Sequence, residues 1–260
     1  MKTFISFSGG VESTTMCILY GANATAIWCD TGAEHEEMYA RIDHVEQQIK
    51  AIHPNFELIR LKPSVTVLDK KCETLTDAVL EWRFMPDGQN RYCTGRFKIA
   101  PIDNFLKQQG QCELFIGLNA DETTRTGNYL KAKNVTYRYP LIEDGFTRSD
   151  CEAILLDNDL HPQFPIYMQR GGCWMCFYKT RKEYKALAIL NPAEFQRCIE
   201  FESAYQDHRE KFYSILSTGE SMQQIQNEVN REIELWGIEE VKNMYSKIPA
   251  HKTCGPFCHR

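Results

Sequence analysis

The sequence predicts an α/β fold: a mostly parallel sheet with helices on both faces, followed by a helical C-terminal region. Over roughly the first 150 residues, short apolar runs typical of strands alternate with segments of helical periodicity. A glycine-containing turn at residues 8–10 joins the first of these strands to the first helix. From residue 182 to residue 247 the apolar spacing is helical. We therefore expect an α/β domain over residues 1–181 and a helical extension over residues 182–260.

Each element is predicted from its own apolar pattern. A strand starting near residue 4 is followed by a helix over residues 16–20, and further strands are expected at 25–28, 56–61 and 114–117. The other helices of the domain are expected at 36–52 and 102–107, and those of the extension at 184–190, 193–213 and 223–245. Residues 62–101, which hold Pro63, Pro86 and Pro101, are less regular and predict an insertion over the site.

Composition excludes several classes of protein. The formal net charge is −5 and no long Lys/Arg run occurs, so the footprint of a dedicated nucleic-acid binder is missing. No stretch approaches the ~20 consecutive apolar residues of a transmembrane helix, and the N-terminus lacks a signal-peptide pattern. We therefore expect a cytoplasmic protein without a membrane partner. In that compartment the 11 cysteines are expected to stay reduced, so the clustered ones are candidate metal ligands.

The turn after the first strand predicts a phosphate-binding loop. Glycines let the chain approach a ligand closely, and the N-terminus of the following helix favours an anion. Hydroxyl side chains surround the turn, and no lysine lies within it, so it is not the phosphate loop that ends in Lys-Ser/Thr. The alternative is an ordinary Gly-Gly turn. The residues expected to contact a nucleotide here are Ser8, Gly9, Gly10, Val11, Glu12, Ser13 and Thr14.

Three later segments add candidate residues. The Asp30-Thr31-Gly32 turn follows the second strand, where Asp30 suits Mg²⁺ or a ribose hydroxyl, although such a turn is also a good helix cap. Residues 91–101 carry several cations that suit a pyrophosphate or sulfate-like group, unless they form a solvated loop. In residues 115–125, Gly117 permits close approach to a nucleoside, whereas Glu122 and Arg125 are spaced like a helix-surface ion pair.

These segments together resemble a known family. The Ser-Gly-Gly loop is similar to that of the PP-loop ATP pyrophosphatases, with Glu12 where that family usually has Asp. The Asp-Thr-Gly turn, the basic segment ending in Lys98-Ile99-Ala100-Pro101, the Gly117 segment and the stretch from Tyr139-Pro140-Leu141 to Tyr167 resemble phosphoadenylylsulfate (PAPS) reductases, in the same order. The stretch differs at Phe146, where the family has Trp.

The resemblance implies an adenine nucleotide α-hydrolase-like fold, ATP with Mg²⁺ as cofactor, and roles for particular residues. Asp30 and Gly117 would line the nucleoside. The residues implied to bind anions are Arg91, Arg96, Lys98 and Arg170, and those implied to be catalytic are Glu12, Lys98 and Cys254. Cys254-Gly255 resembles the mobile tail of the reductases, in which a thiol attacks sulfur, but Pro256 interrupts the pattern.

The cysteines resemble the ligands of the cluster-bearing branch of this family. Cys173-x-x-Cys176 matches its Gly-Cys-x-x-Cys segment, whereas its Cys-Cys pair is reduced here to Cys93 alone. The resemblance implies a [4Fe–4S] cluster on these three thiolates, with Cys258 or Cys254 as the fourth ligand or with one iron open. Zinc would accept the same set, and a site without metal is the remaining alternative. Core packing is expected for the other cysteines, at positions 17, 29, 72, 112, 151 and 198.

Three functions remain open from the sequence. The first is an ATP-dependent sulfurtransferase, which adenylates an acceptor oxygen and replaces it with sulfur from a cluster or a Cys persulfide. The second is an APS or PAPS reductase that produces sulfite. The third is a non-catalytic nucleotide-binding module, and its only support is that Glu12 lies where the family usually has Asp. Besides the nucleotide, the expected partners are a sulfur donor such as a cysteine desulfurase and an acceptor, for which DNA and tRNA are candidates. The helical region is a candidate interface with a second copy of the chain.

Overall fold

The computed structural model describes residues 1–122, 132–169, 172–206 and 213–246 of the 260-residue chain. These residues cluster into two compact units, each assembled from separate stretches of chain. Unit 1 contains residues 1–31, 36–63 and 94–163, and unit 2 contains residues 32–35, 64–93 and the described residues from 164 onward. Neither unit begins or ends at the division predicted between residues 181 and 182, because residues 164–181 cluster with the helices that follow them.

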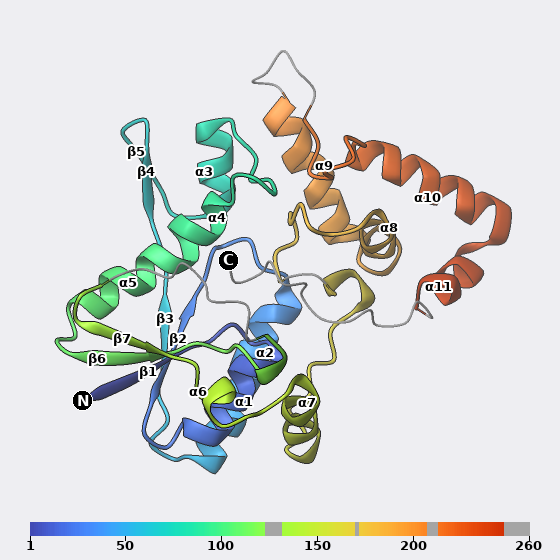
Figure 1. The fold of residues 1–260 in the computed structure, drawn as a ribbon. Coiled ribbons are helices and arrows are strands. Elements are labelled where there is room, and N and C mark those ends of the chain that lie inside the picture. The colour runs from blue at the N-terminus through green and yellow to red at the C-terminus, as the bar shows by residue number, and fades with distance from the viewer. Residues whose placement is uncertain (123–131, 170–171, 207–212, 247–260) are drawn as a thin grey trace. The chain divides into compact units, whose positions relative to one another are not determined.

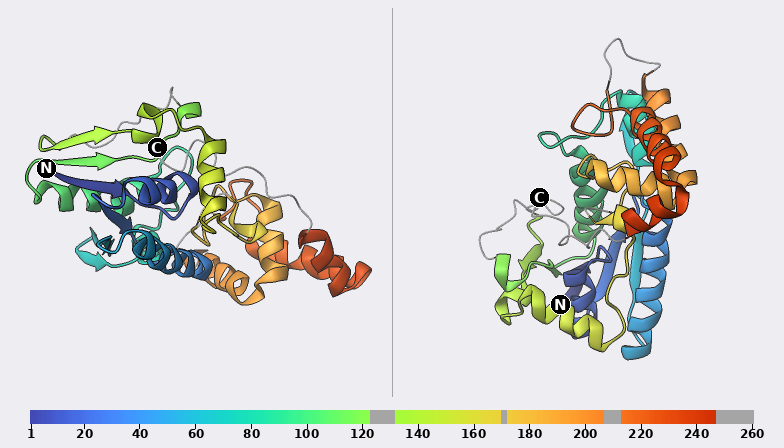
Figure 2. Two further views of the ribbon diagram at one scale, coloured as in Figure 1. Left: turned by 90° about the horizontal axis from the view of Figure 1, so that it is seen from below. Right: turned by 90° about the vertical axis from the view of Figure 1, so that its right-hand side faces the viewer.

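Unit 1 is built on a parallel sheet, as predicted, and the sheet has five strands (Figures 1 and 2). Its strands are β1 (Lys2–Ser6), β2 (Thr25–Cys29), β3 (Leu58–Leu61), β6 (Cys112–Phe115) and β7 (Val135–Arg138). Their order across the sheet is β3-β2-β1-β6-β7. The left view of Figure 2 shows β7 at one edge and β3 at the other. The chain thus adds strands on one side of β1 first and then on the other side.

Helices of unit 1 cover both faces of this sheet. On one face lie α1 (Val11–Tyr20), α2 (Glu36–Ile52) and α7 (Arg148–Asp157), which pack on one another through α1, and on the other lies α5 (Ala100–Lys107) (Figure 1). Right-handed crossovers account for the placement of α1 and α2 on one face and α5 on the other, because the chain adds β2 and β3 on one side of β1 and then crosses to β6 on the other side. The shorter helices of this unit are η1 (Gly95–Ile99, a π-helix), η2 (Ala120–Glu122) and α6 (Pro140–Glu143).

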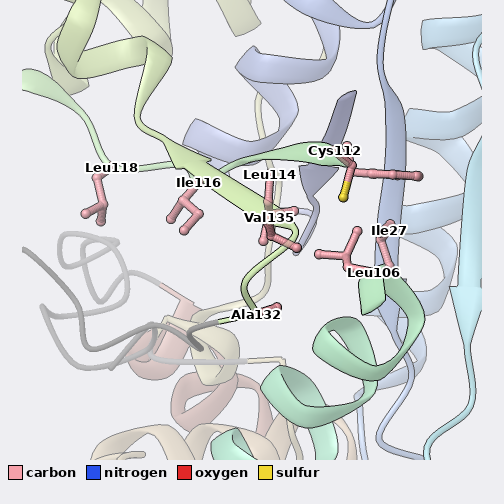
Figure 3. Packing of buried hydrophobic residues seen from close by; sticks show 9 residues of the cluster. Ile27, Leu106, Cys112, Leu114, Ile116, Leu118, Ala132 and Val135 are labelled. Carbon is pink, nitrogen blue, oxygen red and sulfur yellow. The ribbon is translucent and has the colours of Figure 1, made fainter. Parts of the chain in front are cut away.

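The apolar core on the α5 face joins the sheet to that helix. Leu106 of α5 is almost fully buried against Ile27 of β2, Leu114 of β6 and Val135 of β7. Figure 3 shows these side chains gathered beside Cys112, with Ile116 and Leu118 extending the cluster beyond the end of β6. Parallel strands buried on both faces need such continuous apolar runs, which is why short apolar stretches predicted them.

Unit 2 contains the helical region and a small hairpin. The hairpin strands are β4 (Val65–Val67) and β5 (Lys70–Cys72), and the helices are α3 (Leu75–Trp82), η3 (Ile166–Met168), α8 (Arg181–Leu190), α9 (Pro192–Gln206), α10 (Met222–Trp236) and α11 (Ile238–Ser246). The short helix α4 (Tyr92–Thr94) carries the chain from unit 2 into unit 1. Helix α8 is the centre of the helical region, since α9, α10 and α11 all pack against it.

Some boundaries differ from those predicted. The helical pattern over 223–245 is two helices, because Gly237 with φ of +78° ends α10. The strand predicted at 114–117 ends at Phe115, and residues 62–101 are more regular than expected, since they form β4, β5, α3, α4 and η1. Residues 207–212, the end of the pattern at 193–213, lie outside the described part of the chain. None of the described helices is both long and apolar enough to cross a bilayer.

We predict that Leu106→Ala destabilises the protein by roughly 2–5 kcal/mol, because it removes a buried side chain from a core that cannot fully close over the gap. Leu106 is 1% exposed. Leu156→Ala is the matched control, since Leu156 on α7 is 60% exposed and its truncation is expected to change stability by less than about 0.5 kcal/mol. Urea unfolding followed by circular dichroism measures both. Equal losses for the two variants would contradict this description of the core.

Candidate functional site

The predicted nucleotide-binding segments meet at one edge of the parallel sheet. The strand order reverses between β1 and β6, and in open α/β sheets a ligand lies beyond the carboxyl ends of the strands at such a reversal. Ser8, Gly9 and Gly10 follow β1, Asp30 follows β2, and Gly117 lies two residues after β6. Unit 1 alone therefore assembles residues that are more than a hundred positions apart in the chain.

The Ser8–Gly10 loop requires its first glycine. Gly9 has a φ of +75°, and a Cβ atom there would lie 2.9 Å from Cδ1 of Ile42 on α2. The loop is also tied to the helix it opens: the backbone N–H of Ser8 donates to Oγ of Ser13 at 3.2 Å, and the hydroxyl of Ser13 donates to the carbonyl of Gly10 at 3.3 Å. The hydroxyls of Ser8 and Ser13 lie 3.1 Å apart. The turn is thus held before any ligand arrives.

Helix α1 begins without a side-chain cap. Its N-cap residue is Gly10, which has no side chain to accept from the first-turn N–H groups. By contrast, α3, α7, α8 and α10 all begin with capping boxes, at Thr74, Thr147, Thr180 and Ser221. The first-turn N–H groups of α1 have no carbonyl partner within the helix, so they are suited to an anion.

Not every predicted loop residue presents its side chain to a ligand. Thr14 is completely buried, and its Oγ1 accepts a 3.4 Å hydrogen bond from Arg41. Val11 is 5% exposed, so its side chain is packed in the interior and is not presented to a ligand. The hydroxyl of Thr15 donates to the carbonyl of Val11 at 3.0 Å, one helical turn back. The hydroxyls that sequence reasoning offered to phosphate therefore serve partly to support the loop from behind.

Glu12 is fixed by two side chains that come from distant segments. Arg148 at the start of α7 donates from Nη1 to Oε1 of Glu12 at 2.5 Å, and Asn119 donates from Nδ2 to the same oxygen at 3.0 Å. Arg148 also donates from Nε to Glu152 at 2.8 Å, which orients its guanidinium. Within the described residues, no donor bonds Oε2 of Glu12. Sequence reasoning missed Arg148 and Asn119 as site residues, although both lie inside the segments that it quoted.

Gly117 is explained by close packing against α1. A Cβ atom there would lie 3.1 Å from Cε of Met16, 3.2 Å from Cβ of Glu12 and 3.3 Å from the backbone N of Ser13. The chain leaving β6 therefore passes directly over the first turn of α1. This packing gives Gly117 a reason to be glycine that is independent of any nucleoside.

Asp30 and Lys98 both lie by the end of β2. Oδ1 of Asp30 accepts a 2.8 Å hydrogen bond from Tyr39 of α2. The thiol of Cys29 donates to the carbonyl of Lys98 at 3.4 Å. Burial raises the pKa of Cys29 to about 12, and the ammonium of Lys98 acts in the opposite direction, so Lys98 adds positive charge at the end of this strand.

The basic segment forms an unusual turn. Arg96 and Lys98 are exposed on the π-helix η1, whose Phe97 is completely buried and anchors it. Inserted π-turns of this kind re-aim side chains and occur often at functional sites. Two of the predicted anion-binding residues, Arg96 and Lys98, belong to unit 1, and a third, Arg91, belongs to unit 2. Arg170 lies outside the described residues.

The Cys173–Cys176 turn is firmly held within unit 2. Trp174 is buried between Phe201, with ring centroids 5.4 Å apart, and Arg197, whose guanidinium lies 4.6 Å from the ring centroid. The hydroxyl of Tyr184 donates to the carbonyl of Cys176 at 3.1 Å. The backbone N–H of Trp174 donates to the carbonyl of Ala33, beside an antiparallel bridge between residues 34 and 173. The turn therefore has a fixed shape.

Unit 2 also brings the segment of Cys93 toward this turn. Arg91, two residues before Cys93, stacks on the ring of Tyr178, two residues after Cys176, at 5.2 Å. Tyr92 is fixed in turn, because its ring lies edge-on to Trp82 at 4.8 Å and its hydroxyl donates to the carbonyl of Phe84 at 2.5 Å. Cys93, Cys173 and Cys176 are each partly exposed, a property expected of thiols that bind a group from outside.

The remaining described cysteines behave as predicted for core residues. Those at positions 17, 29, 72, 112, 151 and 198 are all buried, and burial raises the pKa of each thiol. Their burial identifies them as side chains of the core. Cys254 and Cys258, the predicted tail nucleophile and fourth ligand, lie outside the described residues.

We predict that Glu12→Asp lowers the affinity for Mg–ATP on the order of 10-fold, because the shorter side chain no longer reaches Arg148 and Asn119 and the carboxylate loses its fixed position. Isothermal titration calorimetry measures the affinity. Glu152→Gln is the matched control: it removes the other carboxylate partner of Arg148, on the solvent side, and leaves Glu12 in place. Unchanged binding by Glu12→Asp, or an equal loss in Glu152→Gln, would show that the position of Glu12 does not matter.

Comparison with known proteins identifies the family. A family model described as the phosphoadenosine phosphosulfate reductase domain matches residues 2–179. No curated protein matches the chain. The matched span runs from β1 through the Cys173–Cys176 turn, so it includes every candidate residue described above except Cys254 and Cys258. The chain belongs to the phosphoadenosine phosphosulfate reductase domain family, with the α/β fold and the nucleotide-related sulfur chemistry of that family.

Proposed function

We propose that the chain is an ATP-dependent sulfurtransferase. The loop at residues 8–14 holds Mg–ATP, an acceptor oxygen attacks the α-phosphorus, and the bond to the bridging oxygen breaks to release pyrophosphate. Sulfur at the oxidation level of hydrosulfide then attacks the activated acceptor carbon or phosphorus, and AMP leaves with the acceptor oxygen. The net result exchanges one oxygen of the acceptor for sulfur.

The single observation that supports this most strongly is the uncapped start of α1 behind the Ser8–Gly10 loop. In the transition state negative charge grows on the departing pyrophosphate. Fixed N–H groups and the positive end of a helix stabilise such charge without having to reorganise. A reductase that acts on APS or PAPS, in which sulfate is joined to the nucleotide phosphate as a mixed anhydride, does not release pyrophosphate and has less need of this loop.

Charged residues around the loop supply the remaining roles. Glu12, held by Arg148 and Asn119, and Asp30, held by Tyr39, offer carboxylate oxygens to Mg²⁺, which prefers such ligands. Lys98 and Arg96 on η1 offer positive charge to the phosphates or to the acceptor. These assignments extend the sequence prediction and give Glu12 a defined orientation.

The cysteines of unit 2 are proposed to hold a [4Fe–4S] cluster, with zinc as the alternative metal. Their chemistry fits, since thiolates are the ligands of both, and Cys93, Cys173 and Cys176 are the partly exposed ones among the described cysteines. A cluster bound there would present sulfur as a nucleophile. In this proposal a cysteine desulfurase supplies the sulfur as a persulfide, and a thiol reductant releases it as hydrosulfide while the thiol is oxidised to a disulfide. DNA or tRNA is the acceptor class.

Reduction of APS or PAPS is the second candidate, and the family match favours it directly. In that reaction a cysteine thiolate attacks the sulfur of the substrate, the AMP phosphate or its 3′-phosphorylated form leaves, and an external thiol releases sulfite. The sequence prediction places this thiolate at Cys254. The two functions therefore differ in whether pyrophosphate or sulfite is produced.

Product analysis distinguishes them. We predict that the anaerobically purified protein releases pyrophosphate from ATP, and that bulk tRNA or DNA increases the rate, because adenylation of the acceptor is the step that expels pyrophosphate. Parallel reactions with APS and PAPS in the presence of dithiothreitol are expected to yield no sulfite above the protein-free blank. Sulfite production without pyrophosphate release would replace the sulfurtransferase proposal with the reductase.

The metal is tested separately. We predict absorbance near ~400 nm and about four irons per chain after anaerobic purification, lost in Cys93→Ser and Cys176→Ser. Cys112→Ala is the matched control, since Cys112 belongs to the core of unit 1 and its replacement is expected to retain the iron. One zinc and no iron would make these cysteines structural ligands, and unchanged iron in Cys93→Ser would remove that residue from the set.

A further inference from the structure

Helix α2 buries an arginine in its apolar stripe. The buried residues of this helix are Met38, Arg41, Ile42, Val45 and Ile49, which follow the spacing of a core-facing surface. Arg41 is 8% exposed, although arginine is rarely buried unless a carboxylate pairs with it. Within the described residues no carboxylate forms an ion pair with Arg41.

The guanidinium of Arg41 instead donates to uncharged oxygens directly behind the phosphate loop. Its Nε donates to the carbonyl of Gly9 at 3.4 Å, and its Nη2 donates to Oγ1 of Thr14 at 3.4 Å and to the carbonyl of Leu160 at 2.5 Å. Two of these acceptors belong to the loop and to the first turn of α1. The arginine therefore contacts the back of the turn whose front is offered to an anion.

Burial lowers the pKa of Arg41 to about 10, so the side chain remains protonated at physiological pH. A buried charge without a counter-ion is unfavourable, and hydrogen bonds to carbonyl groups offset this only partly. An anion on the other side of the loop would supply the missing negative charge. In a low-dielectric surrounding this interaction is screened little by salt.

We propose that Arg41 is the fixed counter-charge of the phosphate-binding loop, a positioning and specificity-determining residue that favours ligands of higher negative charge. It holds the carbonyl of Gly9 away from the ligand and adds a full positive charge to the partial one at the start of α1. The inference rests on the proposed function only in placing a polyphosphate in this loop. It adds that discrimination among polyphosphate, monophosphate and neutral nucleoside depends on a residue of α2.

The test compares variants that separate charge from shape. Arg41→Lys keeps the charge, whereas Arg41→Gln keeps an N–H donor and removes the charge. We expect Arg41→Gln to weaken binding of inorganic pyrophosphate on the order of 10-fold, to weaken binding of AMP less, and to leave binding of adenosine unchanged. Arg41→Lys is expected to stay within about 3-fold of the wild type for all three. Calorimetric titrations with these ligands, at low and high salt, provide the measurement.

Arg60→Gln is the matched control. It makes the same change in net charge within unit 1, but Arg60 is 36% exposed and paired with Asp43 and Glu46. It is expected to bind pyrophosphate like the wild type. Arg41→Met replaces Arg41→Gln if the latter does not fold, because Met fits the apolar stripe of α2.

The outcomes separate this inference from the proposed function. If the wild type binds pyrophosphate and Arg41→Gln binds it equally, or loses adenosine binding to the same extent, the counter-charge role is wrong while the sulfurtransferase proposal stands. If the wild type does not bind pyrophosphate at all, this inference is overturned together with the phosphate loop. If pyrophosphate binds as expected but ATP is never cleaved, the proposed function fails and the role of Arg41 remains.

Discussion

The site depends on one packing constraint: the chain must turn from β1 into α1 between two neighbours that leave no room for a side chain. On one side, α2 presses Ile42 and Met38 against Gly9, and on the other, the exit from β6 presses Gly117 against the first turn of α1. Gly9 needs a positive φ as well as the missing Cβ. This constraint brings the start of α1 to the strand-order reversal with its N–H groups uncapped, and every proposed role of the loop follows from it.

Much of this could be predicted from the sequence because the information is local. The helix expected at 36–52 has the same bounds as α2, and the helix expected at 184–190 ends at the same residue as α8. Apolar periodicity and turn chemistry act over a few residues, so a single sequence displays them. The break at Gly237 was missed because the apolar spacing continues on both sides of it, and only the positive φ reveals the end of α10.

The partners of the loop could not be predicted, since they come from elements far away in the chain. Arg148 and Asn119 reach Glu12 from the start of α7 and from the segment after β6, and no spacing rule connects them with residue 12. Arg41 offered a weak signal, a cation at a core position of a helix, but its acceptors became evident only from the fold. Sequence patterns thus locate the site, and tertiary packing determines which side chains complete it.

The central claim is that the first turn of α1 binds the phosphates of ATP. Hydrogen exchange followed by mass spectrometry tests it most directly, with and without Mg²⁺ and an ATP analogue that carries a methylene bridge between the α and β phosphates. We predict slower exchange in peptides that span residues 8–14, with pyrophosphate alone giving the same protection and adenosine giving none there. Protection confined to other segments, or no change in residues 8–14, would contradict it.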